Sequence, residues 1–200
     1  METILELSPI DWVILVLAIA AYAPLVLGIT RQEDKSQTAF TWTLYLILDC
    51  ITMFTCKMEK GAYIMLFGFA IGSLVMAVIL LYQRRFGWTL LETITIILIV
   101  ICVSFWQISG SYWAIRFSIA AESIVGIYLI IKTFKNPVVE YNFMGYVSFL
   151  IVSVLALFAA KNFSIPQIGF PFCETVLNVI ILVPLIRKWY LDKILEQVVA

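Results

Sequence analysis

The chain has 200 residues, of which 63% are apolar and 13% are charged, and its formal net charge is zero. An ordinary soluble domain carries about 25% charged residues, and a soluble domain of this size cannot bury so much apolar surface. The composition therefore excludes an ordinary soluble protein. It also excludes a nucleic-acid partner, because the chain has no excess of basic residues to bind phosphates.

Histidine is missing from the chain altogether, so the commonest general base and the commonest metal ligand are missing with it. The four cysteines form no C-x-x-C pair and lie in or beside apolar runs, where we interpret them as small apolar fillers. They are Cys50, Cys56, Cys102 and Cys173. We expect no catalytic residue, no metal site and no cofactor, and we do not expect an enzyme.

Seven apolar runs follow one another along the chain, and each is about as long as the 20 residues that a membrane-spanning helix needs. Only short polar breaks separate them, so neighbouring helices must be antiparallel and no soluble domain fits between them. The runs cover 12–30, 38–56, 61–82, 88–107, 112–131, 143–160 and 167–187. We expect an all-α polytopic protein with seven transmembrane helices in the cell (inner) membrane.

The segment before the first run carries Glu2, Glu6 and Asp11 and has no Lys or Arg. A secretory signal peptide normally begins with positive charge, so we expect the first run to be retained as a transmembrane helix rather than cleaved.

The distribution of Lys and Arg predicts the orientation. The breaks after the first, third and fifth runs, together with the tail, carry nine of them, whereas the other breaks carry three, and Arg116 lies inside the fifth run. Basic residues accumulate in cytoplasmic loops. The N-terminus is therefore expected outside and the C-terminus in the cytoplasm.

A shift of 104 residues brings the charged breaks of the first three runs onto those of the last three. Arg31 falls on Lys135, for example, and Trp42 falls on Tyr146. A single connecting helix between two three-helix units gives both units the same orientation. This arrangement predicts parallel repeats around a central solute site. Evenly sized helices would also produce coincident breaks by chance. The predicted parts are a first bundle at 1–86, a connecting helix at 87–110 and a second bundle at 111–200.

Charged side chains inside membrane spans are costly and usually face the bundle interior, where they mark a pathway or form a structural pair. Glu174 and Asn178 are four residues apart, so they share one helix face. We predict a substrate or ion pathway lined by Glu122, Glu174, Asn178, Asp49 and Trp42. Buried carboxyls that serve only a structural role are the alternative.

Pro24 lies inside the first run and removes one backbone hydrogen bond there. We predict a kink at this position, which would act as a hinge in a transporter or as a static bend tolerated by packing.

Several short motifs are spread over nearly the whole chain. They are Ala21-Tyr22-Ala23-Pro24, the Thr38 to Trp42 entry to the second run, Glu122, the Lys132 to Pro137 turn, and Pro171 followed by Asn178. The set resembles the SWEET and PQ-loop transporters, and it is most similar to a largely uncharacterised branch of small bacterial proteins of the PQ-loop type. The resemblance implies the 3+1+3 fold and transport of a small solute.

The chain departs from that pattern at three places. Pro24 is followed by Leu25 instead of Gln, Tyr128 stands where the repeat would place a proline, and Pro166-Gln167 lies at the break between the sixth and seventh runs. Transport of sugars specifically is therefore not implied.

The expected partners are the lipid bilayer and a small solute whose identity the sequence does not reveal, and a homo-oligomer is left open. A non-transporting membrane interaction or assembly protein is the alternative function, because the tail 191–200 is amphipathic enough to lie on a membrane or meet a partner.

Overall fold

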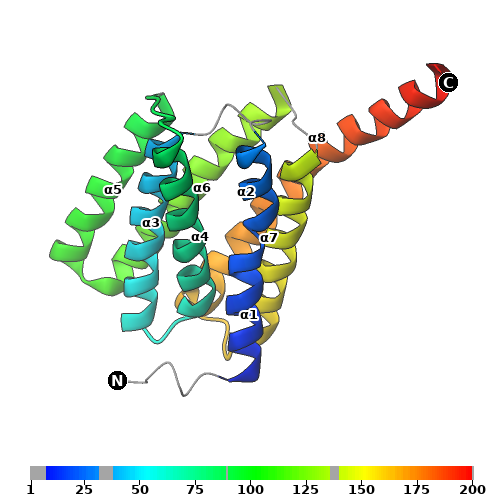
Figure 1. Ribbon diagram of the computed structural model, residues 1–200. Helices are drawn as coiled ribbons and strands as arrows, with labels where there is room; N and C mark the ends of the chain where they lie inside the picture. Colours follow the sequence, from blue (N-terminus) through cyan, green and yellow to red (C-terminus); the bar gives the residue numbers. More distant parts are fainter. Residues whose placement is uncertain (1–7, 32–37, 89, 136–139, 200) are drawn as a thin grey trace.

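The computed structural model describes residues 8–31, 38–88, 90–135 and 140–199, and these form helices without any strand (Figure 1). The helical elements in chain order are α1 Pro9–Ala20, α2 Ala23–Thr30, α3 Ala39–Met58, α4 Tyr63–Tyr82, α5 Leu90–Ser109, α6 Ser111–Lys135, α7 Glu140–Ala159, the π-helical turn η2 Ile165–Gly169, and α8 Phe170–Val199.

Every predicted apolar run coincides with a helical segment. Six helical stretches of the described chain are long and apolar enough to cross a membrane, and α7 contains a shorter apolar stretch, Phe143–Ala159. The multi-pass helical class is therefore confirmed. The last helix was expected to end near residue 187, but α8 continues to Val199. An ion pair of 2.6 Å between Lys188 and Asp192, one turn apart, supports this extension.

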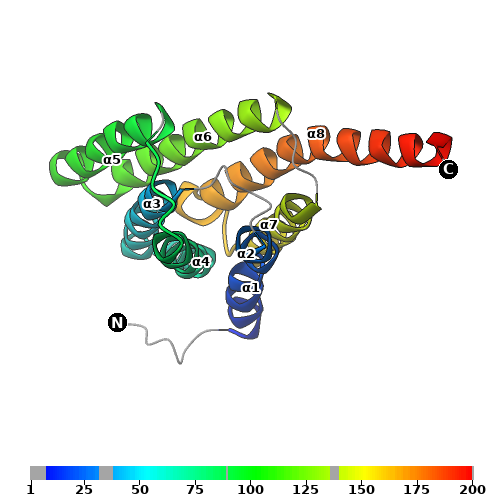
Figure 2. The ribbon, with the colours of Figure 1, turned by 45° about the horizontal axis from the view of Figure 1, so that its top comes forward.

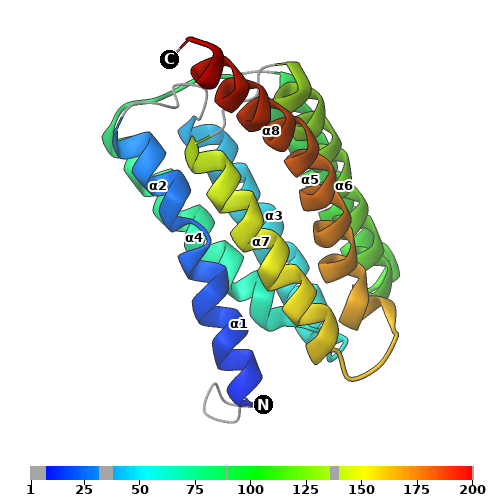
Figure 3. The same cartoon turned by 90° about the vertical axis from the view of Figure 1, so that its right-hand side faces the viewer.

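The first apolar run is broken into α1 and α2 at the position where a kink was predicted. Helix α1 begins with a capping box in which Ser8 and Asp11 bond to each other's backbone N–H groups. Pro24 stands in the first turn of α2, where its missing N–H is tolerated. Tyr22 N–H bonds to the Ile19 carbonyl at 3.2 Å, three residues back, which marks the local break in the helix. Figure 3 shows the resulting bend between α1 and α2.

Two groups of helices pack in the same manner. In the first, α4 packs against both α1 and α3, and in the second, α8 packs against both α6 and α7. The groups meet where α3 contacts α6 and where α7 contacts α1 and α2, and α5 lies outside, against α6 and α3 (Figure 2).

Small residues bring α4 close to the first helix. A Cβ atom on Gly68 would lie 2.5 Å from Ala18 Cβ, and one on Gly72 would overlap the Tyr22 ring. Gly68 and Gly72 therefore form a packing face, as the small-xxx-small spacing predicts.

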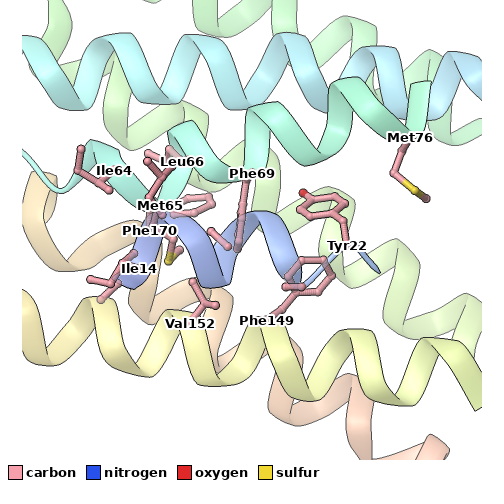
Figure 4. Close-up of a cluster of buried hydrophobic side chains, with 14 of the residues drawn as sticks. Ile14, Tyr22, Ile64, Met65, Leu66, Phe69, Met76, Phe149, Val152 and Phe170 are labelled. Carbon is pink, nitrogen blue, oxygen red and sulfur yellow. The ribbon is translucent and has the colours of Figure 1, made fainter. Parts of the chain in front are cut away.

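We call the end where α1, α4, α6 and α8 begin the N face, and the opposite end the C face. A continuous apolar core extends from the N face, at Ile14 and Ile64, toward the C face, at Ile29 and Leu80, and Figure 4 shows part of it. Among the core residues are Ile14, Met65, Leu66, Ile115, Val152 and Phe170.

Candidate functional site

A cavity of about 230 Å³ lies between the two helix groups, in the half of the bundle nearer the C face. Its lining reaches from Thr38 and Leu91, at the C-face ends of α3 and α5, to Phe69 and Phe170 on α4 and α8. Asp49 is eleven residues along α3 from Thr38, which corresponds to about 16 Å of helix. This central cavity therefore extends from the C face to the middle of the bundle.

The structure places all five predicted pathway residues in the wall of this cavity. They come from α3, α6 and α8 and are Trp42, Asp49, Glu122, Glu174 and Asn178. Pro24 itself is outside the lining, but Tyr22 and Leu25, on either side of it, belong to the wall.

Asp49 is the one acidic residue of α3, and only 7% of its surface is exposed. Its Oδ2 accepts a hydrogen bond of 2.8 Å from the Ser73 hydroxyl on α4. The Tyr22 hydroxyl lies 3.3 Å from Ser73 Oγ, and Tyr22 must be the donor there because the Ser73 hydrogen points to Asp49. A chain of hydrogen bonds thus joins the break in the first helix to the Asp49 carboxylate.

Glu122 projects from α6 toward α3. Its Oε1 lies 2.8 Å from Thr52 Oγ1, and the same hydroxyl lies 2.9 Å from the Leu48 carbonyl oxygen. Thr52 is on α3 and Glu122 is on α6, so this contact crosses the interface between the two helix groups. Thr52 is fully buried there. Asp49 and Glu174 line the same cavity as Glu122.

Glu174 and Asn178 lie on one face of α8, as their spacing predicts. Asn178 Nδ2 donates to Glu174 Oε2 at 3.2 Å and to the Glu174 backbone carbonyl at 2.7 Å. The Asn178 amide therefore holds the Glu174 carboxylate against its own helix through Oε2, and Glu174 Oε1 takes no part in this contact.

A fourth carboxylate, Glu92 on α5, also lines the cavity, close to the C face. It is 1% exposed and accepts a hydrogen bond from the Thr41 hydroxyl and a long one, of 3.5 Å, from Thr38, the residue that caps α3. Glu92 was not among the predicted pathway residues, because an acidic residue early in a helix commonly interacts with the helix N-terminus alone. Thr38 and Thr41, two hydrogen-bond donors at the start of α3, are the sequence feature that could have indicated a partner for Glu92.

Aromatic side chains form a large part of the remaining wall, and Trp42 is the one aromatic residue that was predicted to line a pathway. Tyr22 packs edge-to-face against Trp42, Phe69 and Phe149, with ring centroids 5.8, 6.1 and 4.9 Å apart. Phe69 also contacts Phe170 at 6.1 Å. Figure 4 shows Tyr22, Phe69, Phe149 and Phe170 among the buried apolar side chains, and the same four residues belong to the cavity lining. Helical periodicity alone could not distinguish these rings from ordinary core residues.

Arg116 lies apart from the cavity, near the N-face start of α6. Its guanidinium stacks over the rings of Tyr112 and Trp113 at 4.2 and 4.8 Å and bonds to the Tyr112 hydroxyl. This arrangement is typical of an anchor at a membrane interface. Within the described part of the chain, no three His, Cys, Asp or Glu side chains are grouped closely enough to hold a metal ion.

No family model matches the chain, and no curated protein or solved structure gives a significant match. The class that the fold defines is a multi-pass helical membrane protein with a carboxylate-lined central cavity.

Proposed function

We propose that the protein is a small-solute carrier or facilitator of the PQ-loop/SWEET-like type, with seven spans arranged as a 3+1+3 parallel repeat. The observation that carries this proposal is the central cavity, into whose wall both helix groups place carboxylates. A protein that served only as a membrane scaffold would have no need for buried acidic side chains around a hollow centre, because such groups are costly in lipid.

The 104-residue shift supports the repeat. Five pairs of residues related by this shift line the cavity with both members, and the pairs are Tyr22 and Gly126, Leu25 and Leu129, Trp42 and Tyr146, Tyr45 and Phe149, and Ser73 and Leu177. The packing has the same symmetry, since α4 relates to α1 and α3 as α8 relates to α6 and α7. On this arrangement α5 is the connecting helix.

The difference between the two halves of the bundle supports a carrier with alternating access. The cavity lining includes Thr38 and Leu91 at the C face, whereas Ile14, Ile64 and Met65 of the apolar core lie near the N face. With the N-terminus outside, as the Lys and Arg distribution predicts, the cavity lies on the cytoplasmic side. The break at Ala21–Tyr22, next to Pro24, is where the first helix would bend during a change of access.

Ligand-dependent thermal stability tests this function. A solute that binds only the folded protein must raise its unfolding midpoint. We would screen sugars, nucleosides, amino acids, amines and vitamins against wild type, Glu122→Gln and Glu174→Gln, with Asp192→Asn as a control outside the cavity. A shift that Glu122→Gln or Glu174→Gln abolishes, and that Asp192→Asn retains, supports the proposal. No shift with any solute contradicts it.

A second function, membrane interaction or assembly without transport, is favoured by the extension of α8. This extension projects beyond the bundle at the C face (Figure 1), with Trp189, Lys193 and Leu195 exposed and Lys193 stacked over Trp189 at 4.4 Å. Removal of residues 191–200 distinguishes the two. A carrier would retain its ligand-induced stabilisation after truncation, whereas an assembly protein would lose its association.

A further inference from the structure

The charge of the cavity wall is one-sided. Its lining includes four carboxylates, on Asp49, Glu92, Glu122 and Glu174, and within the described residues it includes no Lys or Arg. Three of them receive one hydrogen bond each from a neighbouring side chain, at Asp49 Oδ2, Glu122 Oε1 and Glu174 Oε2. The second oxygen of each of these three accepts no hydrogen bond from any residue that the structure describes.

Asp49 is the most buried of these three, and its Oδ1, which accepts no hydrogen bond from a described residue, is accessible from the cavity instead of being enclosed by protein. An ionised carboxylate in a low-dielectric site is strongly unfavourable unless a cation or several donors compensate it. Glu122 and Glu174 add like charge to the same cavity. A bound cation would supply the compensation that the wall itself lacks.

The rest of the wall indicates what kind of cation fits. Eight lining residues are aromatic, among them Trp42, Tyr45 and Tyr146. Ammonium groups bind well over aromatic faces, and Trp is the best of these partners. Metal cations such as Mg²⁺ and Ca²⁺ instead require several oxygen ligands at fixed short distances. Aromatic faces beside spread carboxylates therefore suit a cation with an organic surface.

We propose that the solute of the central cavity is a small organic cation, such as a primary amine or a quaternary ammonium compound. This inference rests on the proposed carrier function and specifies its substrate class. The ammonium lies among Asp49, Glu122 and Glu174, and the aromatic rings enclose its carbon atoms. An anionic solute is repelled by the same wall, and a neutral polyol leaves the carboxylate charges uncompensated.

A matched pair of probes tests the charge requirement. Choline and 3,3-dimethyl-1-butanol have nearly the same shape, but only choline is charged. We would measure the thermal midpoint of the purified protein in a nonionic detergent with each probe, and binding of each by calorimetry. Sodium chloride at equal concentration controls for ionic strength, and 1,4-diaminobutane with 1,4-butanediol forms a second pair. The amines should raise the midpoint while their neutral partners and sodium chloride do not.

Variants locate the binding. Asp49→Asn and Glu174→Gln should each weaken choline binding about tenfold or more, because each removes a negative charge that attracts the quaternary ammonium group. Asp192→Asn, on the α8 extension, should leave binding unchanged. Trp42→Phe should retain binding that Trp42→Leu loses. If the carboxylate variants fail to fold, the wild-type comparison of choline with its neutral partner still decides the charge requirement.

Three results would overturn the inference. Equal stabilisation by 3,3-dimethyl-1-butanol or by sodium chloride removes the role of the organic cation. Undiminished choline binding in both Asp49→Asn and Glu174→Gln excludes the central cavity as the binding site. If glucose raises the thermal midpoint and no amine does, the substrate class is overturned and the carrier proposal survives. If neither amines nor neutral solutes raise the midpoint, the result counts against both proposals.

Discussion

Gly72 of α4 lies directly against the ring of Tyr22, so that a Cβ atom on Gly72 would stand 2.2 Å from Tyr22 Cδ2. The contact holds the ring between α4 and its aromatic neighbours Trp42 and Phe149. It also brings the Tyr22 hydroxyl to Ser73, the residue after Gly72, and hence to Asp49. A single missing side chain thus sets the position of one wall of the central cavity.

Gly72→Ala should destabilise the protein, because the new Cβ atom would overlap the Tyr22 ring and push it away from its contacts with Trp42 and Phe149. Overpacking of this kind costs about 1–3 kcal/mol, which exceeds the roughly 1 kcal/mol that Ala gains over Gly in a helix. Gly126→Ala is the matched control, since its new Cβ atom would meet only the end of the Leu177 side chain, 2.6 Å from Cδ1. Thermal unfolding in detergent measures both. A Gly72→Ala midpoint at or above that of Gly126→Ala would show that the ring is free to move.

Ser73→Ala should destabilise the protein by about 1–3 kcal/mol, because it removes the donor to a buried carboxylate. Tyr22→Phe should cost less, since its bond of 3.3 Å reaches Asp49 only through Ser73. A double-mutant cycle of Ser73→Ala and Asp49→Asn isolates the direct contact. Additive free energies of unfolding in that cycle would mean that the 2.8 Å hydrogen bond contributes nothing.

The helices could be predicted from the sequence because long apolar runs bounded by charged breaks leave few alternatives in lipid. The predicted run 38–56 became α3 Ala39–Met58, and 61–82 became α4 Tyr63–Tyr82. The predicted run 167–187 ends where the apolar residues end, but α8 continues to Val199 because a helix can extend beyond the membrane into water.

Three of the four carboxylates in the cavity wall could also be predicted, since intramembrane carboxylates usually face inward. Glu122, Glu174 and Asp49 were selected on this ground and line one cavity. The aromatic wall could not be selected in this way, because Phe69 and Phe149 have the same periodicity whether they face a cavity or a packed core. Only the three-dimensional arrangement of helices from both groups separates these two cases.

Glu122→Gln should increase stability while it removes the response to ligand. The wild-type cavity holds several carboxylates without a described cation, so a neutral amide relieves repulsion from Asp49 and Glu174. Functional residues commonly reduce stability in this way, and a gain of about 1 kcal/mol is expected. Thermal midpoints with and without ligand test both parts. Asp192→Asn should change neither, because its carboxylate pairs with Lys188 on the surface. A large fall in the Glu122→Gln midpoint would assign Glu122 a structural role through its contact with Thr52.

Pro24→Ala should slow transport more than it changes stability. Pro24 occupies the first turn of α2, where proline is tolerated, so its replacement should alter the free energy of unfolding by no more than about 1 kcal/mol. Alanine restores an N–H that can bond to the Ala20 carbonyl and favours one continuous helix across the break at Ala21–Tyr22. Pro184→Ala is the control, because Pro184 lies inside the unbroken helix α8. Uptake into proteoliposomes, measured with the solute identified by the stability screen, should fall several-fold in Pro24→Ala and remain near wild type in Pro184→Ala. Equal rates in all three proteins would show that the bend at Pro24 is static, and the conformational change would then have to occur elsewhere in the bundle.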